Sequence, residues 1–211
     1  MKVKHYMTKE VITATSDVKI SNAVDIMEEH DFHRLPIVDQ GKFVGLITEE
    51  MIAKNSPSKV SSLSIYEMNY LFDKVLIKDL MEKNVRTIDE NVLLEEAALI
   101  MTDNDITVLP VLNKKNEIIG IITHKDIFKA LIELTGYKDE GSRIVVITPQ
   151  DRLGILAQIS KALADHAINL THIFVNRPED VIEITLQTTG INSKMTQQVL
   201  ENLGYKTYEI L

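Results

Sequence analysis

The chain contains one pattern twice, and this internal duplication constrains its fold more than any other feature. The first copy aligns with the second at an offset of 74 residues (77 − 3), which becomes 75 (120 − 45) after one insertion. The matching segments are 3–7 with 77–81, 35–38 with 109–112, and 45–48 with 120–123. A duplicated unit cannot easily bury its apolar face alone, so the copies are expected to pack against each other. The cleft between them is the first place to seek a ligand site.

Each copy is predicted to form a strand, a helix, two strands and a second helix. In the first copy the elements are 11–13, a helix opened by Ser21-Asn22, 34–38, 43–48 and 49–54. The second copy repeats this order, with 113–116 as a longer turn. Between the copies, residues 65–72 have the apolar spacing of an amphipathic helix, which favours a packing or dimer face over a cofactor site.

The C-terminal part has a different pattern. Its predicted elements are strand 143–148, helix 155–166, strands 168–175 and 181–188, helix 194–202 and strand 206–211. This βαββαβ order is typical of two helices on one face of an antiparallel sheet. The stretch 134–141, with two glycines and several charges, is predicted as the domain boundary.

The duplicated segments resemble a pair of CBS domains, the tandem called a Bateman module. The resemblance rests on Val11-x-Thr13, Leu35-Pro36-Ile37-Val38, Gly45-Leu46-Ile47-Thr48 and their second copies. The tail resembles an ACT domain through Asp151-Arg152-Leu153-Gly154 and Ala167-Ile168-Asn169-Leu170, although that family usually has proline where this chain has Leu153. The order CBS, CBS, ACT, with a helix between the repeats, is similar to the AcuB-type acetoin-utilisation proteins.

The predicted architecture is therefore an α/β (α+β) chain with a tandem CBS pair followed by a ferredoxin-like ACT domain. The predicted limits are 1–60 for the first CBS domain, 61–76 for the linker helix, 77–135 for the second CBS domain and 142–211 for the ACT domain.

The CBS resemblance implies an adenosyl ligand, such as AMP, ADP, ATP or S-adenosylmethionine. The family motif Gly-x-x-Thr/Ser-x-x-Asp is kept in the second copy as Gly120, Thr123 and Asp126, whereas the first copy has Met51 where the acid belongs. A carboxylate accepts hydrogen bonds from a ribose diol, and a thioether cannot take over this role. The sequence therefore predicts unequal clefts and favours the one built on Asp126.

The remaining residues of that cleft follow from the same resemblance. Thr87 is expected at the cleft, Ile106 and Val108 beside the base, and His33 and Arg34 at the phosphate, which arginine binds well. The alternative interpretation makes Arg34 a solvated surface base and Asp126 a helix-start acid stabilised by the helix dipole.

The ACT resemblance implies an amino-acid site at the turn before the first helix of that domain, where two copies pair. The expected residues are Asp151, Leu153, Gly154 and Ile155, completed by the amide of Asn169. The alternative is a plain strand-to-helix connection capped by Asp151, with the domain serving only for dimerisation.

Composition narrows the function further. The net charge is −8, whereas a nucleic-acid-binding protein usually has a basic surface. No apolar run in the sequence is long enough to span a bilayer. The absence of cysteine excludes thiolate chemistry and fits a cytoplasmic protein. No catalytic constellation or histidine pair with metal-ligand spacing is evident, so no enzyme, catalytic residue, metal or catalytic cofactor is expected.

The sequence thus favours a regulatory small-molecule sensor, with an adenosyl ligand in the CBS cleft, an amino acid or dimerisation at the ACT domain, and an unknown regulated protein. A homodimer is expected. The alternatives are a non-catalytic scaffold with vestigial clefts and, third, an undetected acetoin-related enzyme.

Overall fold

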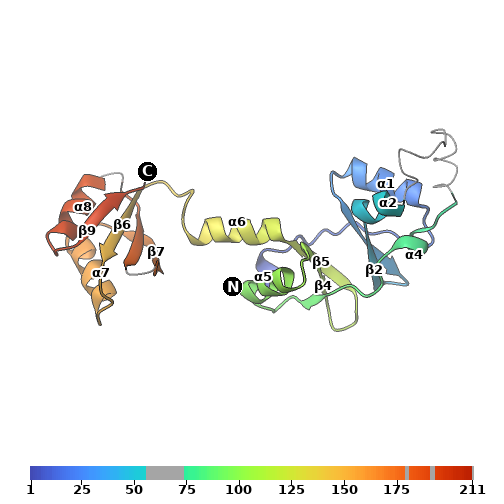
Figure 1. Ribbon diagram of the computed structural model, residues 1–211, viewed down its shortest axis with the longest axis horizontal. Coiled ribbons are helices and arrows are strands. Elements are labelled where there is room, and N and C mark those ends of the chain that lie inside the picture. Colours follow the sequence, from blue (N-terminus) through green and yellow to red (C-terminus); the bar gives the residue numbers. More distant parts are fainter. Residues whose placement is uncertain (56–73, 179–180, 191–192, 211) are drawn as a thin grey trace. The chain divides into compact units, whose positions relative to one another are not determined.

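The computed structural model describes residues 1–55, 74–178, 181–190 and 193–210 (Figure 1). Two compact units divide the chain, Met1–Ile127 and Phe128–Leu211. In the described part of the chain, no helix is long and apolar enough to cross a membrane. The predicted linker helix 61–76, with its amphipathic stretch 65–72, falls largely outside the described residues.

The first unit repeats one set of elements. The first copy comprises the 3-10 helix Val3–His5, α1 Ile20–Glu29, β1 Arg34–Asp39, β2 Lys42–Thr48 and α2 Glu49–Asn55. The second copy comprises α4 Ile77–Leu80, β3 Ile88–Asp89, α5 Leu94–Asp103, β4 Val108–Leu112, β5 Ile118–Thr123 and α6 His124–Leu134, whose end enters the second unit. The predicted duplication is therefore present in the structure.

The two copies use the same pairing. β1 and β2 are antiparallel, as are β4 and β5, and both hairpins have a register irregularity toward the turn, after Ile37 and after the equivalent Val111. β3 runs parallel to β4, and its counterpart in the first copy is the single bridge between Ala14 and Ile37. In each copy the helix before the hairpin buries three equivalent side chains. These are Ile20, Ala23 and Met27 in α1, and Leu94, Ala97 and Met101 in α5.

Reciprocal backbone bridges join the copies. Leu46 in β2 of the first copy and Glu82 of the second copy exchange two backbone hydrogen bonds of 2.9 Å. Likewise, Ile121 in β5 of the second copy and Thr8 of the first copy exchange two backbone hydrogen bonds of 2.9 Å. The glycines of the Gly-x-x-Thr motif lie at these crossings: a β-carbon on Gly45 would be 2.6 Å from the Glu82 carbonyl oxygen. The expected packing of the copies against each other is therefore confirmed, and it explains why a glycine precedes each motif threonine.

The second unit contains the predicted βαββαβ order. Its elements are β6 Ser142–Thr148, α7 Ile155–Asp165, β7 Leu170–Asn176, β8 Ile182–Thr188, α8 Ser193–Glu201 and β9 Lys206–Glu209. The strands form an antiparallel sheet of order β7-β8-β6-β9. Alternate residues of β6 and β8, such as Ile144 and Leu186, pack on buried α7 residues such as Ile159 and Leu163. This is the ferredoxin-like arrangement expected from the sequence.

The boundary between the compact units lies inside α6, whereas the sequence placed it in 134–141. The reason is that residues 135–141 pack on the sheet of the second unit. Arg143 donates to the carbonyl oxygen of Thr135 at 3.2 Å and lies over the rings of Tyr137 and Phe174. Gln187 donates to the carbonyl oxygen of Asp139 at 3.2 Å. These contacts make residues 135–141 part of the second unit. The limits given for the individual domains remain predictions.

Candidate functional site

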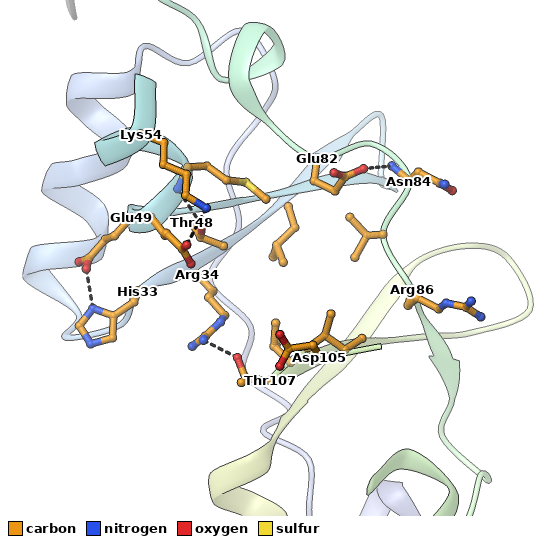
Figure 2. Close-up of a pocket in the computed structure, with 16 residues that line it drawn as sticks. His33, Arg34, Thr48, Glu49, Lys54, Glu82, Asn84, Arg86, Asp105 and Thr107 are labelled. Atoms are coloured by element: carbon orange, nitrogen blue, oxygen red, sulfur yellow. Dashed lines mark hydrogen bonds and ion pairs between the residues drawn. The ribbon is translucent and has the colours of Figure 1, made fainter. Parts of the chain in front are cut away.

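A pocket of about 530 Å³ lies between the two copies in the first unit (Figure 2). It is bounded by the β2–α2 junction of the first copy and by the segments 82–86 and 105–108 of the second. Its lining residues are His33, Arg34, Leu46, Thr48, Glu49, Glu50, Met51, Lys54, Glu82, Asn84, Val85, Arg86, Asp105, Ile106, Thr107 and Val108. Its size is within the range of ligand pockets.

The start of α2 is built by Thr48. Its hydroxyl oxygen accepts a hydrogen bond from the backbone N–H of Met51 at 3.2 Å, which caps the helix. The helix start is also held by the backbone N–H of Glu49, which donates to the carbonyl oxygen of His33 at 3.1 Å. The thioether of Met51 thus stands in the first turn of α2, where the motif of the second copy has a carboxylate.

Five apolar side chains line the pocket between the charged ones. Leu46 and Val108 are buried, and Met51, Val85 and Ile106 are partly buried. Such a surface suits a flat apolar group, since burial of apolar area stabilises a bound ring.

Two acidic side chains of the pocket contact basic side chains. His33 Nδ1 lies 2.9 Å from the Glu49 carboxylate, and Lys54 Nζ lies 2.7 Å from the Glu50 carboxylate. The hydrogen bond from Lys54 lowers the pKa of Glu50, and the charge of Lys54 lowers it further. Both pairs are largely exposed, so they contribute little to stability and open readily to a ligand.

Two guanidinium groups, those of Arg34 and Arg86, also line the pocket. Arg34 Nη2 donates to the hydroxyl of Thr107 at 2.5 Å. Figure 2 shows Arg34 and Lys54 on one side of the pocket and Arg86 on the other. Among the described residues no carboxylate lies within ion-pair distance of Arg34 or Arg86. The charge of Arg34 lowers the pKa of Glu50 only as a minor contribution after that of Lys54. A guanidinium that is not in a close ion pair is available to an anionic ligand group.

The corresponding junction of the second copy, between β5 and α6, differs chemically. The backbone N–H and the hydroxyl of Thr123 both donate to Asp126 Oδ2, at 2.9 and 2.8 Å. This is a helix-start arrangement that Met51 cannot reproduce, because methionine has no comparable acceptor. Asp126 thus lies in the first turn of α6, as both interpretations of this residue require, and its ligand role stays a prediction.

The pocket groups the predicted residues differently from the expectation. It brings His33, Arg34, Ile106 and Val108 together around Thr48 and Met51, and its lining does not include Thr87, Thr123 or Asp126. The physical reason is the crossed packing: the helix start of one copy faces the pre-strand loop of the other. Thr87 is the residue before β3.

Thr107 connects this pocket to the helix start that carries Asp126. Its hydroxyl accepts from Arg34, and its carbonyl oxygen accepts from the backbone N–H of His124 at 3.1 Å. Thr107, Arg86 and Lys54 were not predicted as site residues from the sequence. Only Lys54 had a sequence signal, its spacing of four residues from Glu50.

A second cavity, of about 400 Å³, lies in the second unit at the turn before α7. Its lining includes the predicted Asp151, Leu153, Gly154 and Ile155. Gly154 has a positive φ of 86°, a conformation that glycine adopts without strain. Arg177, which was not predicted from the sequence, also lines the cavity, and its Nη2 lies 2.8 Å from the Asp151 carboxylate.

Within one chain, Asn169 does not lie with these residues, and its part in a site formed where two copies pair stays a prediction. β7 begins at Leu170 opposite Thr188, and its other end, Asn176, pairs with Glu183. The turn before α7 follows the Thr148 end of β6, which pairs with Ile182. Asn169 therefore lies at the opposite end of the sheet, because α7 carries the chain back along its length. Its amide could reach such a turn only in a partner chain.

Comparison with known families explains the duplicated architecture. Residues 3–58 and 77–133 match the CBS domain, and residues 142–204 match the ACT domain. The two CBS matches together cover more than half of the chain. The chain belongs to the CBS-domain family. It is a CBS pair followed by an ACT domain, as the sequence predicted.

Relatives support the same assignment. The uncharacterized CBS relative MJ1225 of Methanocaldococcus jannaschii is 34% identical over 128 residues, which are 60% of this chain and 46% of that protein. An inosine-5'-monophosphate dehydrogenase of the same organism is 30% identical over 176 residues, 81% of this chain and 32% of the enzyme. The chain thus spans less than half the length of these two relatives.

Two solved structures are informative. The CBS pair of MJ0100, solved in complex with 5'-methylthioadenosine and S-adenosyl-L-methionine, is 32% identical with a TM-score of 0.51. The match covers 62% of this chain and 99% of that one. AcuB of Vibrio cholerae, whose name refers to acetoin utilization, is 25% identical with a TM-score of 0.54, over 65% of this chain and 95% of that one.

Proposed function

We propose that this chain is a regulatory sensor whose CBS pair binds an adenosyl ligand, namely AMP, ADP, ATP or S-adenosylmethionine. The observation that carries the proposal is the pocket of about 530 Å³ between the repeats. It combines an apolar wall for a base with Arg34, whose guanidinium donates to Thr107 and, among the described residues, forms no ion pair at contact distance. The complex of the related MJ0100 CBS pair with two adenosyl compounds supports the ligand class.

In this proposal the two clefts are unequal. In the described pocket, Ile106 and Val108 flank the base, while Arg34 and His33 bind phosphate. The second cleft is built on Thr123 and Asp126, whose carboxylate accepts hydrogen bonds from a ribose diol. Thr87 belongs to the same proposed ligand set, although it does not line the described pocket.

The ACT domain has a second role in the proposal. It binds an amino acid or joins two chains into a homodimer, and the CBS ligand controls an as yet unknown protein partner. The likeness to AcuB supports a connection with acetoin utilisation. The chain itself is proposed to be non-catalytic, so the adenosyl compound is a ligand and not a catalytic cofactor.

One observation favours the alternative of an interaction scaffold with vestigial clefts. Met51 occupies the acid position of the first copy and offers no acceptor for a ribose diol. A scaffold would lose ligand affinity and keep its partner surfaces.

Calorimetric titration of the full chain tests the proposal. AMP, ADP, ATP, S-adenosylmethionine and adenosine are each titrated at constant ionic strength, with GMP as the control for the base. Saturable binding of an adenosyl compound, with weaker binding of GMP, is the expected result. Absence of binding by every adenosyl compound would favour the scaffold.

A further inference from the structure

One side-chain hydrogen bond crosses between the two copies at the wall of the described pocket. The guanidinium of Arg34 in the first copy donates through Nη2 to the hydroxyl of Thr107 in the second copy, at 2.5 Å (Figure 2). In the duplication, Val108 is the equivalent of Arg34 and His33 is the equivalent of Thr107, at the offset of 74 (108 − 34). A valine side chain has no donor, so the duplication cannot form this bond a second time.

Both ends of this bond are tied to a helix start. The carbonyl oxygen of His33, the residue before Arg34, accepts from the backbone N–H of Glu49, the first residue of α2, at 3.1 Å. The carbonyl oxygen of Thr107 accepts from the backbone N–H of His124, the first residue of α6, also at 3.1 Å. The bond between Arg34 and Thr107 therefore links the starts of the two helices on which the two proposed clefts are built.

The bond can be displaced by an anion in the described pocket, which is the first of the two clefts. Thr107 is exposed and lines this pocket. Its hydroxyl takes one hydrogen bond from Arg34, whereas a phosphate is an ionised acceptor that takes two parallel hydrogen bonds from one guanidinium. A ligand phosphate therefore withdraws the guanidinium from Thr107, and a nucleoside without phosphate leaves the bond in place.

We propose that Thr107 couples the two clefts, so that a phosphorylated ligand in the first cleft weakens ligand binding in the second. The inference rests on the proposed adenosyl binding and adds the regulation of that binding. Without ligand, Arg34 holds Thr107, whose carbonyl oxygen holds the start of α6, where Thr123 and Asp126 lie.

The sign of the coupling follows from the loss of this restraint. When phosphate takes Arg34, the start of α6 is held less firmly, and ordering it around a second ligand costs conformational entropy. By linkage, a ligand in the second cleft weakens the phosphorylated ligand in the first cleft by the same factor. Thr107 is thus a positioning residue for the second cleft.

The first test measures the coupling by calorimetric titration of the full chain with AMP. Asp126→Ala isolates the first cleft, and Val85→Trp isolates the second, because Val85 lines the pocket and the larger ring fills it. The coupling factor is the product of the two dissociation constants of the unmodified chain divided by the product of the two single-cleft constants. We expect a factor of about 5 to 10 for AMP, at the lower end for coupled sites, and about 1 for adenosine.

Substitution of Thr107 assigns the coupling to its hydroxyl. Thr107→Val should lower the factor for AMP to about 1, whereas Thr107→Ser keeps the hydroxyl and should keep the factor. Thr102→Val is the matched control, because the Thr102 hydroxyl donates to the carbonyl oxygen of Ala98 within α5, outside the pocket lining. This variant should leave the factor unchanged.

A second measurement does not depend on filling the first cleft. In the Asp126→Ala chain, adding Thr107→Val should tighten AMP by about 2- to 10-fold, the range for one hydrogen bond, because the hydroxyl no longer competes for Arg34. Adenosine affinity should stay the same. A structural role of Thr107 alone would instead weaken both ligands. Thermal unfolding of each variant checks that the chain is folded.

The outcomes separate this inference from the proposed function. A coupling factor near 1 for AMP, a factor that Thr107→Val leaves unchanged, or first-cleft binding of AMP that this variant does not tighten overturns the inference. A single AMP binding step in the unmodified chain also overturns it and leaves the proposed adenosyl sensor intact. Absence of binding by every adenosyl compound contradicts both.

Discussion

At the scale of single residues, one substitution distinguishes the two copies. Thr48 and Thr123 occupy equivalent positions, but only the second copy has an acid three residues later. Asp126 accepts two hydrogen bonds from Thr123, whereas Met51 only donates its backbone N–H to Thr48. The same fold therefore presents a carboxylate at one helix start and a thioether at the other.

We predict that Asp126→Ala weakens adenosyl-ligand binding much more than Met51→Ala does. The loss of a charged hydrogen-bonding partner is worth about 1.5–3 kcal/mol, or about 10- to 100-fold in affinity. Titration of both variants with the tightest adenosyl ligand measures the difference. Because Asp126 also caps α6, Asp126→Asn is the control that keeps one acceptor at the helix start. Equal and small effects of Asp126→Ala and Met51→Ala would contradict the unequal-cleft proposal.

A second prediction concerns Arg34. Arg34→Ala should reduce the affinity for AMP more than the affinity for adenosine, because the guanidinium is proposed to bind phosphate. Added salt should weaken the binding of AMP to the unmodified chain more than the binding of adenosine. Lys42→Ala is a control at an exposed cation in the same strand pair, outside the pocket lining. Matching losses for nucleotide and nucleoside would make Arg34 a surface base.

At the scale of elements, the motif glycines set the distance between the copies. Gly45 faces the backbone of the other copy at Glu82, while Gly120 faces the side chain of Met7. Backbone atoms cannot yield without moving a strand, whereas a methionine side chain adopts another rotamer.

Gly45→Ala should therefore destabilise the protein by about 1–3 kcal/mol, the usual range for overpacking, and Gly120→Ala by less. Gly190→Ala is the control, because no atom lies within 4 Å of the added β-carbon. Urea unfolding of the three variants gives the free energies. A loss for Gly120→Ala as large as that for Gly45→Ala would show that Met7 is as fixed as the backbone.

At the scale of the whole molecule, apolar side chains remain exposed on α6. Phe128, Leu131 and Leu134 are 58%, 57% and 50% exposed in the single chain. Three such residues on one helix are typical of an interaction surface. A two-fold pair of identical chains is the commonest way to cover such a surface.

We expect a homodimer in solution. Light scattering at micromolar concentration should give about twice the monomer mass of 23.9 kDa. Residues 135–141 pack on the ACT sheet. A truncated variant that ends at Leu134 therefore lacks the ACT sheet together with the residues that pack on it. If this shorter chain remains dimeric, the CBS pair is sufficient for assembly. A mass near 23.9 kDa for the full chain would contradict the dimer.

The sequence by itself determined the architecture. The repeated Leu-Pro and Gly-x-x-Thr segments, with their strand and helix periodicities, predicted the CBS pair and the ferredoxin-like tail, because local patterns specify local elements. They also predicted that Met51 and Asp126 make the copies unequal, since this follows from residue type alone.

Only the tertiary structure decided which residues meet. The crossed bridges at Leu46–Glu82 and Thr8–Ile121 place Arg34, Ile106 and Val108 around Met51, and no local pattern carries that information. The course of α7 separates Asn169 from Asp151, while the ends of β7 and β8 bring Arg177 to Asp151. The resemblance had grouped Arg34, Ile106 and Val108, but contacts between distant segments depend on how whole elements pack, so only the fold could decide that this group surrounds Met51 and not Asp126.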